Sequence, residues 1–532
     1  MSNRIQAATL KRWLHDGNEI ALFDVREHGQ YGEGHPFYAV PLPWSVLERD
    51  VGRLAPNPRV RLVVFDDDDA QAGPAALAAA RLGALGYTAV HRLEGGARAW
   101  RDAGFVLFKG VNVPSKAFGE LVEETAKTPH ISAGTLLRWQ QSATPPVVLD
   151  GRPLGEFAAM SIPGASCCPN GELALRIGTF VPDEQTPVVI NCAGRTRSIV
   201  GAQTLIHLGL RNPVYALENG TQGWFLANLP LEHGQRRRYA DGVPPAPARV
   251  AAARALAERT GVEWVDADTV RNWAEAAERT VYLCDVRTPE EFAAGSLVGA
   301  QHAPGGQLQQ ATDQYIGVRH AIIVLFDSDG IRAPVTASWL RQLGHEALVL
   351  EGGLRSGLAL AVPGVPDSVP LPLVDAATLA RGIAERSVSV VDLRSSAAWL
   401  HAHVPGSRWS IRPRLAATLA HCGRAVTIVA DEPHLAAWAV SDLPEAGDHD
   451  ISVLDGGFAA WREWGGAVSD QVSNGAGNEE TTLLPEERLD FLYFVHDRHA
   501  GNKEASRAYL AWELGLLAQL DDEERGGFRP AT

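Results

Sequence analysis

The stretch Pro187-Val-Val-Ile-Asn-Cys-Ala-Gly-Arg-Thr-Arg-Ser198, followed by Ile199-Val-Gly-Ala-Gln-Thr-Leu-Ile206, indicates how the chain folds. Its first part is an apolar run typical of a buried strand, and its last part has the apolar pattern of a helix. Between them stands Cys192, with two arginines among the next five residues. A cysteine at a helix N-terminus near positive charge is favoured as a thiolate, which suits an anionic substrate.

The setting of this stretch recurs along the chain. An Asp-x-Arg element ends an apolar run four times, and a second apolar run follows each one at a similar spacing. The four elements are Phe23-Asp-Val-Arg26, Leu149-Asp-Gly-Arg152, Cys284-Asp-Val-Arg287 and Val391-Asp-Leu-Arg394. The repeats close with Leu93-Glu-Gly-Gly96, Leu217-Glu-Asn-Gly220, Leu350-Glu-Gly-Gly353 and Leu454-Asp-Gly-Gly457. Self-similarity on this scale predicts repeated whole domains rather than a short-period solenoid.

Strand patterns alternate with helical patterns inside each repeat, which predicts an α/β fold with a central, mostly parallel sheet flanked by helices. We expect four tandem domains at residues 1–125, 126–245, 246–368 and 369–470, followed by a linker and a helical tail at 471–532. Residues 471–480 have the composition of a flexible linker. Residues 505–520 have a broad apolar helical face, which predicts packing on one of the domains or on a second subunit in a homodimer.

Composition and charge exclude several classes of function. The formal net charge of −15 disfavours binding to nucleic acid or to acidic membranes, since both require a basic surface. No continuous apolar run is long enough to span a bilayer, and no signal peptide opens the chain, so we expect a soluble cytoplasmic protein. Five scattered cysteines do not make a disulfide framework. No phosphate-binding loop or metal-ligand spacing is present, so neither cofactor nor metal is expected.

The motifs taken together resemble the rhodanese family, the thiosulfate sulfurtransferases, over about residues 1–470. The resemblance is strongest in the second repeat, where Ser161-Ile-Pro-Gly-Ala165 precedes the cysteine loop and Glu218-Asn-Gly-Thr-Gln-Gly-Trp224 follows it. It implies small α/β domains and a cysteine loop that curls into a cradle at a helix N-terminus. The family's usual loop has glycine three residues after the cysteine. This chain has Gly194 at two and Arg195 at three, which leaves the acceptor preference open.

The resemblance also implies the chemistry. Cys192 would be the nucleophile that takes the outer sulfur of thiosulfate, and its persulfide would pass the sulfur to cyanide or to a thiol. The loop residues expected to bind the donor are Ala193, Gly194, Arg195, Thr196, Arg197 and Ser198. Either arginine could instead hold the loop in a salt bridge, and Ser198 has the alternative of a helix cap. Asp150 and Arg152 are expected to form a structural ion pair near the site, and Trp224 to pack beside it.

The other repeats lack the cysteine. The equivalent positions are predicted to be Asp66, Asp327 and Asp431, and a carboxylate cannot carry a sulfane sulfur as a persulfide. Domains 1, 3 and 4 are therefore expected to be catalytically inert scaffold or interface modules. Cys192 is then the single sulfur carrier of the chain.

Two other functions stay open at this stage. One is a sulfurtransferase that uses 3-mercaptopyruvate, because the pocket walls that select the donor cannot be located from sequence. The other is a persulfide carrier or interaction scaffold without turnover. A phosphatase with a Cys-x5-Arg loop is disfavoured, because Ser198 stands where that loop needs its arginine.

Overall fold

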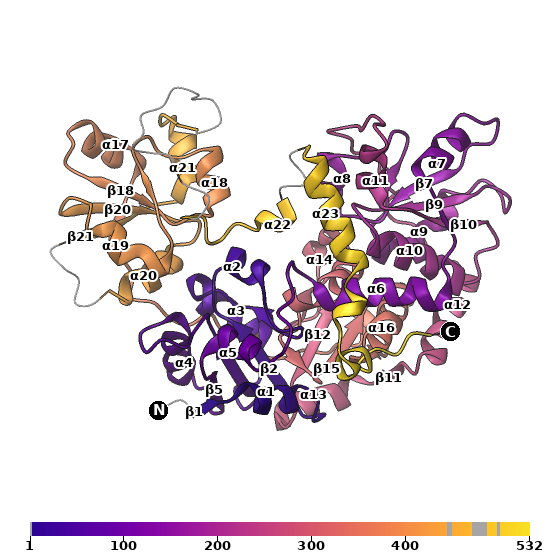
Figure 1. Ribbon diagram of the computed structural model, residues 1–532, viewed down its shortest axis with the longest axis horizontal. Helices are drawn as coiled ribbons and strands as arrows, with labels where there is room; N and C mark the ends of the chain where they lie inside the picture. The colour runs from indigo at the N-terminus through magenta and orange to yellow at the C-terminus, as the bar shows by residue number, and fades with distance from the viewer. Residues whose placement is uncertain (1–2, 444–448, 471–482, 484–486, 497–500, 532) are drawn as a thin grey trace.

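The computed structural model describes residues 3–443, 449–470, 483, 487–496 and 501–531. It contains four repeats, each built on its own parallel sheet with helices on both faces (Figure 1). The predicted fold class is therefore confirmed. The linker predicted at 471–480 lies outside the described residues.

Repeat 2, which carries Cys192, has the sheet order β6-β10-β9-β7-β8. Its central strand β9 is buried along its whole length, as the run Val-Val-Ile-Asn predicts for a strand covered on both faces. Because β9 lies in the middle of a parallel sheet, its carboxyl end opens into the region where such folds place their ligands. The elements are β6 (His130–Ile131), α7 (Ala133–Gln140), β7 (Val147–Asp150), α8 (Leu154–Ala159), β8 (Ser166–Cys167), α9 (Asn170–Arg176), η2 (Ile177–Thr179), β9 (Val188–Asn191), α10 (Thr196–His207), β10 (Val214–Leu217) and α11 (Gly220–Leu226).

Repeat 3 has the same topology, with the order β11-β16-β15-β12-β13. Its last helix is reduced to a single 3-10 turn, η4. The elements are β11 (Glu263–Val265), α13 (Ala267–Ala276), β12 (Val281–Asp285), α14 (Pro289–Ala294), β13 (Gln301–His302), α15 (Gly305–Gln310), η3 (Thr312–Gln314), β14 (Val318–Arg319), β15 (Ile322–Phe326), α16 (Arg332–Gln342), β16 (Glu346–Leu350) and η4 (Gly353–Arg355).

Repeat 1 has a sheet completed by another repeat. Its own strands follow the order β1-β5-β4-β2, with β3 parallel to β2, and β14 of repeat 3 then adds antiparallel to the same strand β2. The elements of repeat 1 are β1 (Asn3–Ile5), α1 (Ala7–Leu14), β2 (Ile20–Asp24), α2 (His28–Glu33), β3 (Val40–Pro41), η1 (Trp44–Val46), α3 (Leu47–Leu54), β4 (Arg61–Phe65), α4 (Pro74–Ala84), β5 (Val90–Leu93) and α5 (Gly96–Asp102).

Repeat 4 has the order β17-β21-β20-β18-β19 and hydrophobic clusters of its own, and Figure 1 shows it set to one side of the other three. It is fastened to repeat 1 by Arg412, which pairs with Glu48 at 2.6 Å and lies over the Trp44 ring. The elements are β17 (Leu373–Val374), α17 (Ala376–Ala384), β18 (Ser389–Asp392), α18 (Ser396–His401), β19 (Arg408–Trp409), η5 (Arg412–Arg414), α19 (Leu415–Leu419), β20 (Ala425–Val429), α20 (Pro433–Ser441), β21 (Asp450–Leu454) and α21 (Gly457–Trp464).

Repeats 1 to 3 share one continuous hydrophobic core. Repeats 2 and 3 face each other through α9, α10, α15 and α16, and the Trp339 indole of α16 donates to the Thr204 hydroxyl of α10 at 2.9 Å. The helices α9 and α15 touch at Gly171 and Gly306, where a Cβ on Gly171 would lie 2.6 Å from the Gly306 nitrogen. Two connecting helices, α6 (Val113–Ala126) and α12 (Pro247–Arg259), pack against α10 and α16 respectively.

The tail packs back on the same chain, as one of the two sequence alternatives predicts. Its elements are α22 (Tyr493–His496), α23 (Lys503–Leu514), η9 (Leu517–Gln519) and α24 (Asp522–Arg525). The helix predicted at 505–520 ends earlier, at Leu514, because Gly515 is a poor helix former and a 3-10 turn follows it. Figure 1 shows α23 running across α6 toward repeat 3. Phe528 then packs against Phe37 and Phe118.

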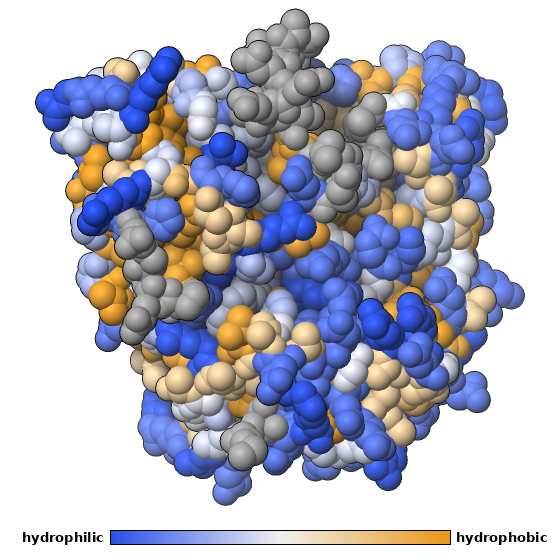
Figure 2. Space-filling view, turned by 60° about the vertical axis from the view of Figure 1, so that its left-hand side comes forward, coloured by the Kyte–Doolittle hydropathy of each residue, from blue (hydrophilic) through white to orange (hydrophobic). Residues whose placement is uncertain are grey.

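The visible surface is mostly hydrophilic, with smaller apolar areas between charged side chains (Figure 2). No helix in the described ranges is long and apolar enough to cross a membrane.

Candidate active site

The loop of Cys192 connects the end of β9 to the start of α10 at Thr196. Helix α11 fixes one side of the loop through two backbone hydrogen bonds, in which the amides of Thr221 and Gln222 donate to the carbonyls of Cys192 (2.8 Å) and Ala193 (3.1 Å). Gly220 makes this approach possible, because its φ is +53° and a Cβ there would lie 2.3 Å from the Cys192 carbonyl oxygen. The Cys192 side chain is only 2% exposed.

The same glycine contact identifies the position of Cys192 in the other repeats. A Cβ on the matching glycines of repeats 1, 3 and 4 would lie 2.4, 2.4 and 2.5 Å from the carbonyl oxygens of Asp66, Asp327 and Ala430. Asp66 and Asp327 therefore stand where the sequence places them, but Asp431 does not. Strand β20 ends at Val429, so the residue directly after it is Ala430, and Asp431 lies one position later with an exposed side chain. The counterpart of Cys192 in repeat 4 is thus an alanine.

In repeat 3 the equivalent loop binds the side-chain carboxylate of its own residue Asp327 through backbone amides. The Asp327 carboxylate accepts the backbone N–H groups of Asp329 (3.2 Å), Gly330 (2.8 Å) and Ala333 (2.7 Å), which stand two, three and six positions further along. Burial still raises the pKa of Asp327 to about 6. In repeat 1, Asp66 accepts the amides of Asp69 (2.7 Å) and Ala75 (3.0 Å) in the same way.

In repeat 2 the matching amides belong to Gly194, Arg195 and Ser198, and none of them donates to another described residue. These amides occupy the positions that bind the Asp327 carboxylate in repeat 3, so within the described residues they remain available to a negatively charged group at Cys192. Converging amides at a helix N-terminus stabilise negative charge.

Arg197 is held by a carboxylate of its own repeat. Its guanidinium donates to both oxygens of Glu156 at 2.8 Å, in the bidentate geometry that arginine makes with carboxylates. The same pair occurs in repeat 3, where Arg332 contacts Glu291 at 2.6 and 2.8 Å. Because repeat 3 has Asp327 in place of the loop cysteine, the pair belongs to the architecture of the repeat. Burial acts to lower the pKa of Arg197, but the Glu156 carboxylate outweighs it and raises the pKa.

Arg195 is held from outside the repeat. It donates to Glu120 of α6 at 2.8 and 2.9 Å and also contacts Glu123 of α6. Repeats 1, 3 and 4 have Asp69, Gly330 and Pro433 at this position, so the arginine is particular to the cysteine loop. Burial raises the pKa of Glu120 to about 7, although the Arg195 pair opposes the shift.

The C-terminal helix α23 also touches the loop. The Thr196 hydroxyl donates to Glu513 at 2.9 Å, and Glu513 is 2% exposed. Its other carboxylate oxygen would lie 2.9 Å from a Cβ at position 194, so Gly194 leaves the space that this carboxylate occupies. On the opposite flank Gly119 of α6 packs against the Thr196 side chain. Two helices from outside repeat 2 therefore enclose the cysteine loop.

Ser198 is 1% exposed, and its hydroxyl has no hydrogen-bond partner among the described residues. It caps no helix, since the structure places it inside the first turn of α10, which begins at Thr196.

Asp150, Arg152 and Trp224 are recurrent parts of the repeat. Arg152 donates to Asp150 at 2.9 and 2.7 Å, and the same pair forms in each of the other repeats. The Asn191 amide joins this pair to the strand that leads to Cys192. Trp224 is buried and donates to the Pro230 carbonyl, as Trp100 and Trp461 do to equivalent carbonyls.

The other thiols of repeats 2 and 3 are buried in the core. Burial raises the pKa of Cys167 and of Cys284 to about 12, and it raises the pKa of Cys168 still further. The Cys167 thiol donates to the Arg152 carbonyl. These thiols are therefore poor nucleophiles at neutral pH.

The sequence does not reveal Glu120, Glu123 or Glu513 as neighbours of the loop. They are distant along the chain and lie on helices that belong to no repeat motif. The sequence signal for such neighbours is the pair of loop arginines, Arg195 and Arg197, because arginines that become buried need acidic partners.

Comparison with known proteins agrees with this architecture. The family model described as Rhodanese-like domain matches residues 6–103, 132–227, 266–359 and 375–463. The crystal structure of a thiosulfate sulfurtransferase from Pseudomonas aeruginosa is 38% identical, with each chain covered over 100% of its length and a TM-score of 0.91. A protein from Anabaena sp. is 25% identical and covers 20% of this chain and 93% of its own, with a TM-score of 0.19. A search of curated proteins found no match.

Proposed function

Because the chain belongs to the family of rhodanese-like domain proteins, we propose that it is a sulfurtransferase that moves the sulfane sulfur of thiosulfate through a persulfide on Cys192 to cyanide or a thiol. The similarity to the Pseudomonas aeruginosa thiosulfate sulfurtransferase supports this donor, since it extends over the whole of both chains.

One observation carries the proposal. The loop amides that bind the carboxylates of Asp66 and Asp327 in two repeats have no partner among the described residues in repeat 2, where a thiol replaces the carboxylate. A persulfide needs both a sulfur nucleophile and stabilisation of negative charge on the outer sulfur. Cys192 is the position in the chain that combines the two.

The first half-reaction is a displacement at sulfur. The Cys192 thiolate attacks the outer sulfur of thiosulfate, a new S–S bond forms, and the original S–S bond breaks with its electron pair leaving on sulfite. The persulfide anion then lies among the amides of Gly194, Arg195 and Ser198, which stabilise it as preorganised donors. This is covalent catalysis with a ping-pong sequence.

In the second half-reaction the acceptor attacks the outer sulfur of the persulfide. With cyanide, a C–S bond forms, the S–S bond breaks, and thiocyanate leaves while Cys192 returns to the thiolate. With a thiolate acceptor, the same exchange gives a persulfide on the acceptor. No redox cofactor is required by either step, because the sulfur moves between nucleophiles.

The two arginines receive different roles in this proposal. Arg197 lies close enough to Cys192 for their charges to interact, and its Glu156 partner is 38% exposed and can yield to a donor anion. Arg197 is therefore proposed to bind the sulfonate end of thiosulfate. Arg195 is a positioning residue, because Glu120 and Glu123 already occupy its guanidinium. Thr196 is assigned to positioning as well, since its hydroxyl donates to Glu513.

The test is a mass measurement on the Cys192 peptide. After treatment with thiosulfate the peptide should gain the mass of one sulfur atom, and cyanide should remove that mass with the formation of thiocyanate. Cys192→Ser should show neither event, while Cys284→Ser serves as the matched control and should show both.

Other outcomes separate the alternatives. A persulfide that forms but does not turn over with cyanide or with small thiols would favour a carrier. If 3-mercaptopyruvate adds sulfur to Cys192 and thiosulfate does not, the protein is a 3-mercaptopyruvate sulfurtransferase instead. No added mass with either donor would refute the proposal.

A further inference from the structure

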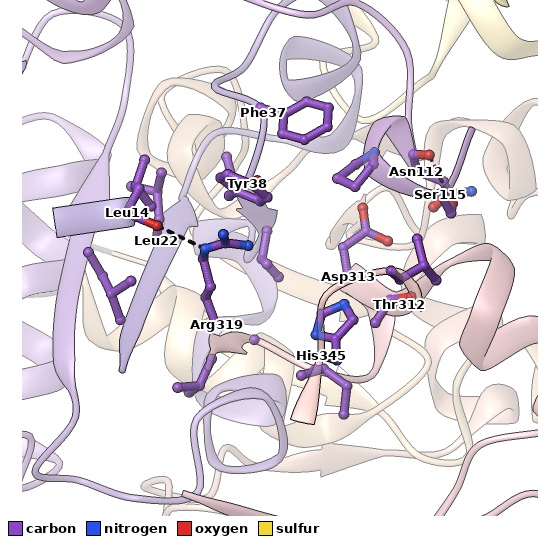
Figure 3. Close-up of a pocket in the computed structure, with 18 of the residues that line it drawn as sticks. Leu14, Leu22, Phe37, Tyr38, Asn112, Ser115, Thr312, Asp313, Arg319 and His345 are labelled. Atoms are coloured by element: carbon purple, nitrogen blue, oxygen red, sulfur yellow. Dashed lines mark hydrogen bonds between the residues drawn. The ribbon is translucent and has the colours of Figure 1, made fainter. Parts of the chain in front are cut away.

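A second cavity lies away from Cys192, where repeats 1 and 3 meet. Its walls come from β2, from the first turn of α6, from β14 and its neighbourhood in repeat 3, and from the end of the tail. Figure 3 shows Arg319 and Asp313 entering the cavity region from different sides, with Tyr38 above Arg319 and His345 nearby. The cavity has a volume of about 70 Å³. One water molecule needs about 10–15 Å³ on this measure, so the space admits about five waters or a molecule of similar size.

Arg319 is the cationic group of this cavity. Its Nε donates to the Leu14 carbonyl at 2.9 Å, and its guanidinium lies over the Tyr38 ring, 3.7 Å from the centroid. Within the described ranges no carboxylate lies within 4.0 Å of the guanidinium. Burial lowers the pKa of Arg319, and Tyr38 is the one side chain that opposes the shift.

In its lack of a counter-ion Arg319 differs from three enclosed arginines elsewhere in the chain. Arg332, Arg412 and Arg195 each have two or more acidic partners. A charge that leaves water without a partner is costly, and an anion bound beside it removes that cost. In a chain with a formal net charge of −15, a half-buried cation without a carboxylate partner at the wall of a cavity points to an anionic ligand from outside.

The remaining walls determine what kind of anion fits. The side chains around Arg319 are predominantly apolar and include Leu14, Leu22, Phe37, Ile316, Leu343 and Phe528. Such a lining suits the hydrocarbon part of an organic acid and offers little to a strongly hydrated inorganic anion. Asn112, Ser115 and Thr312 lie at the other end, and burial holds His345 neutral by lowering its pKa to about 4.

Asp313 limits the charge that the cavity can hold. It is hydrogen-bonded by the Tyr31 hydroxyl at 3.4 Å, and burial raises its pKa to about 6. A second negative charge on the ligand would lie near this carboxyl group, which favours one anionic end over two.

We propose that this cavity binds a small organic monoanion, a monocarboxylate with a short apolar body, whose carboxylate pairs with Arg319. The occupant would touch repeat 1, repeat 3, α6 and the tail at once and would hold these parts together. The site is separate from Cys192 and does not rest on the proposed sulfur transfer.

The test is calorimetric titration of the full chain with butyrate and with butyramide, which has nearly the same shape but no charge. Butyrate should bind at least about tenfold more tightly, the factor expected when a charge-assisted pair is lost. Arg319→Met keeps the apolar stem and should lose the preference for butyrate. Arg211→Met, which removes an exposed arginine of repeat 2, is the matched control and should bind as the unaltered chain does.

A second variant protects the test against misfolding. Leu343→Phe keeps Arg319 and fills the cavity, so it should also abolish binding. The Cys192→Ala chain should bind butyrate unchanged, which separates this site from the sulfur chemistry. Equal binding of butyrate and butyramide, full affinity in Arg319→Met, binding of sulfate as tight as that of butyrate, or no binding of any carboxylate from acetate to hexanoate would overturn the proposal.

Discussion

Arg197 and Arg332 occupy the same position in repeats 2 and 3, and this allows one pair of variants to separate substrate binding from architecture. Both arginines make a bidentate pair with the glutamate of the first helix in their repeat, Glu156 or Glu291. Only Arg197 stands beside a cysteine. The perturbation is Arg197→Met, compared with Arg332→Met in the same chain.

The two substitutions should lower the free energy of unfolding by different amounts. Arg332 is 1% exposed and contacts Glu172 of repeat 2 and Asp329 in addition to Glu291. Its removal leaves buried carboxylates unpaired and should lower the free energy of unfolding by about 3–5 kcal/mol. The Arg197 pair is partly exposed through Glu156, so its loss should lower the free energy of unfolding by only about 1 kcal/mol.

The effects on catalysis should be reversed. A hydrogen bond from arginine to an anionic substrate such as thiosulfate is worth about 1.5–3 kcal/mol. Arg197→Met should therefore reduce kcat/KM for thiosulfate by about 10- to 150-fold. Arg332→Met should leave kcat/KM per folded molecule within about twofold. Urea unfolding and thiocyanate formation measure the two quantities. Unchanged kcat/KM in Arg197→Met, or an equal loss in both variants, would refute the assignment of Arg197 to donor binding.

Three further predictions concern the loop, the interior thiols and the cavity. Gly220→Ala and Gly353→Ala should each destabilise the chain by at least about 2 kcal/mol in urea unfolding, because both have positive φ and no room for a Cβ, but only Gly220→Ala should reduce sulfur transfer per folded molecule. Cys167→Ala should retain sulfur transfer, since its pKa of about 12 keeps it a thiol, and a lost persulfide signal would contradict this. The pKa of Asp313 is raised to about 6, so its folded form keeps a proton that the unfolded chain has lost. This group should therefore contribute a loss of stability of up to about 3 kcal/mol as pH rises from 4 to beyond 6, and Asp313→Asn should reduce the slope of pH-dependent thermal unfolding by that amount, while an unchanged slope would contradict the assignment.

The fold could be predicted from sequence because short local patterns mark the strands, turns and helices of each repeat. Apolar runs ending in Asp-x-Arg predict the buried strands, and the Gly-Gly or Asn-Gly turn predicts where the last helix of a repeat begins. The cysteine loop followed from the same logic, since a strand end and a helix start place Cys192 at the edge of a parallel sheet. Only one step of register failed, in repeat 4, where a shorter connection puts Ala430 and not Asp431 after the strand.

The surroundings of the loop could not be predicted. Glu120 and Glu513 reach it from helices that no repeat pattern specifies, and their contacts join residues separated by 75 and 317 positions. Tertiary contacts of this kind leave no local periodicity in the sequence. The strand β14 is equally hidden, because two residues of one repeat pairing with another repeat have no pattern of their own.

That strand has a consequence for the synthesis of the protein. The strands of repeat 1 are complete at Leu93, but the half of β2 that pairs with Val318 and Arg319 stays without its neighbour for roughly 225 more residues. At about 5–20 residues per second, the nascent chain carries this open edge for about 10–45 s. Open edges pair readily with other chains. Repeat 1 thus leaves the ribosome with unfinished backbone pairing, which is completed when β14 of repeat 3 emerges.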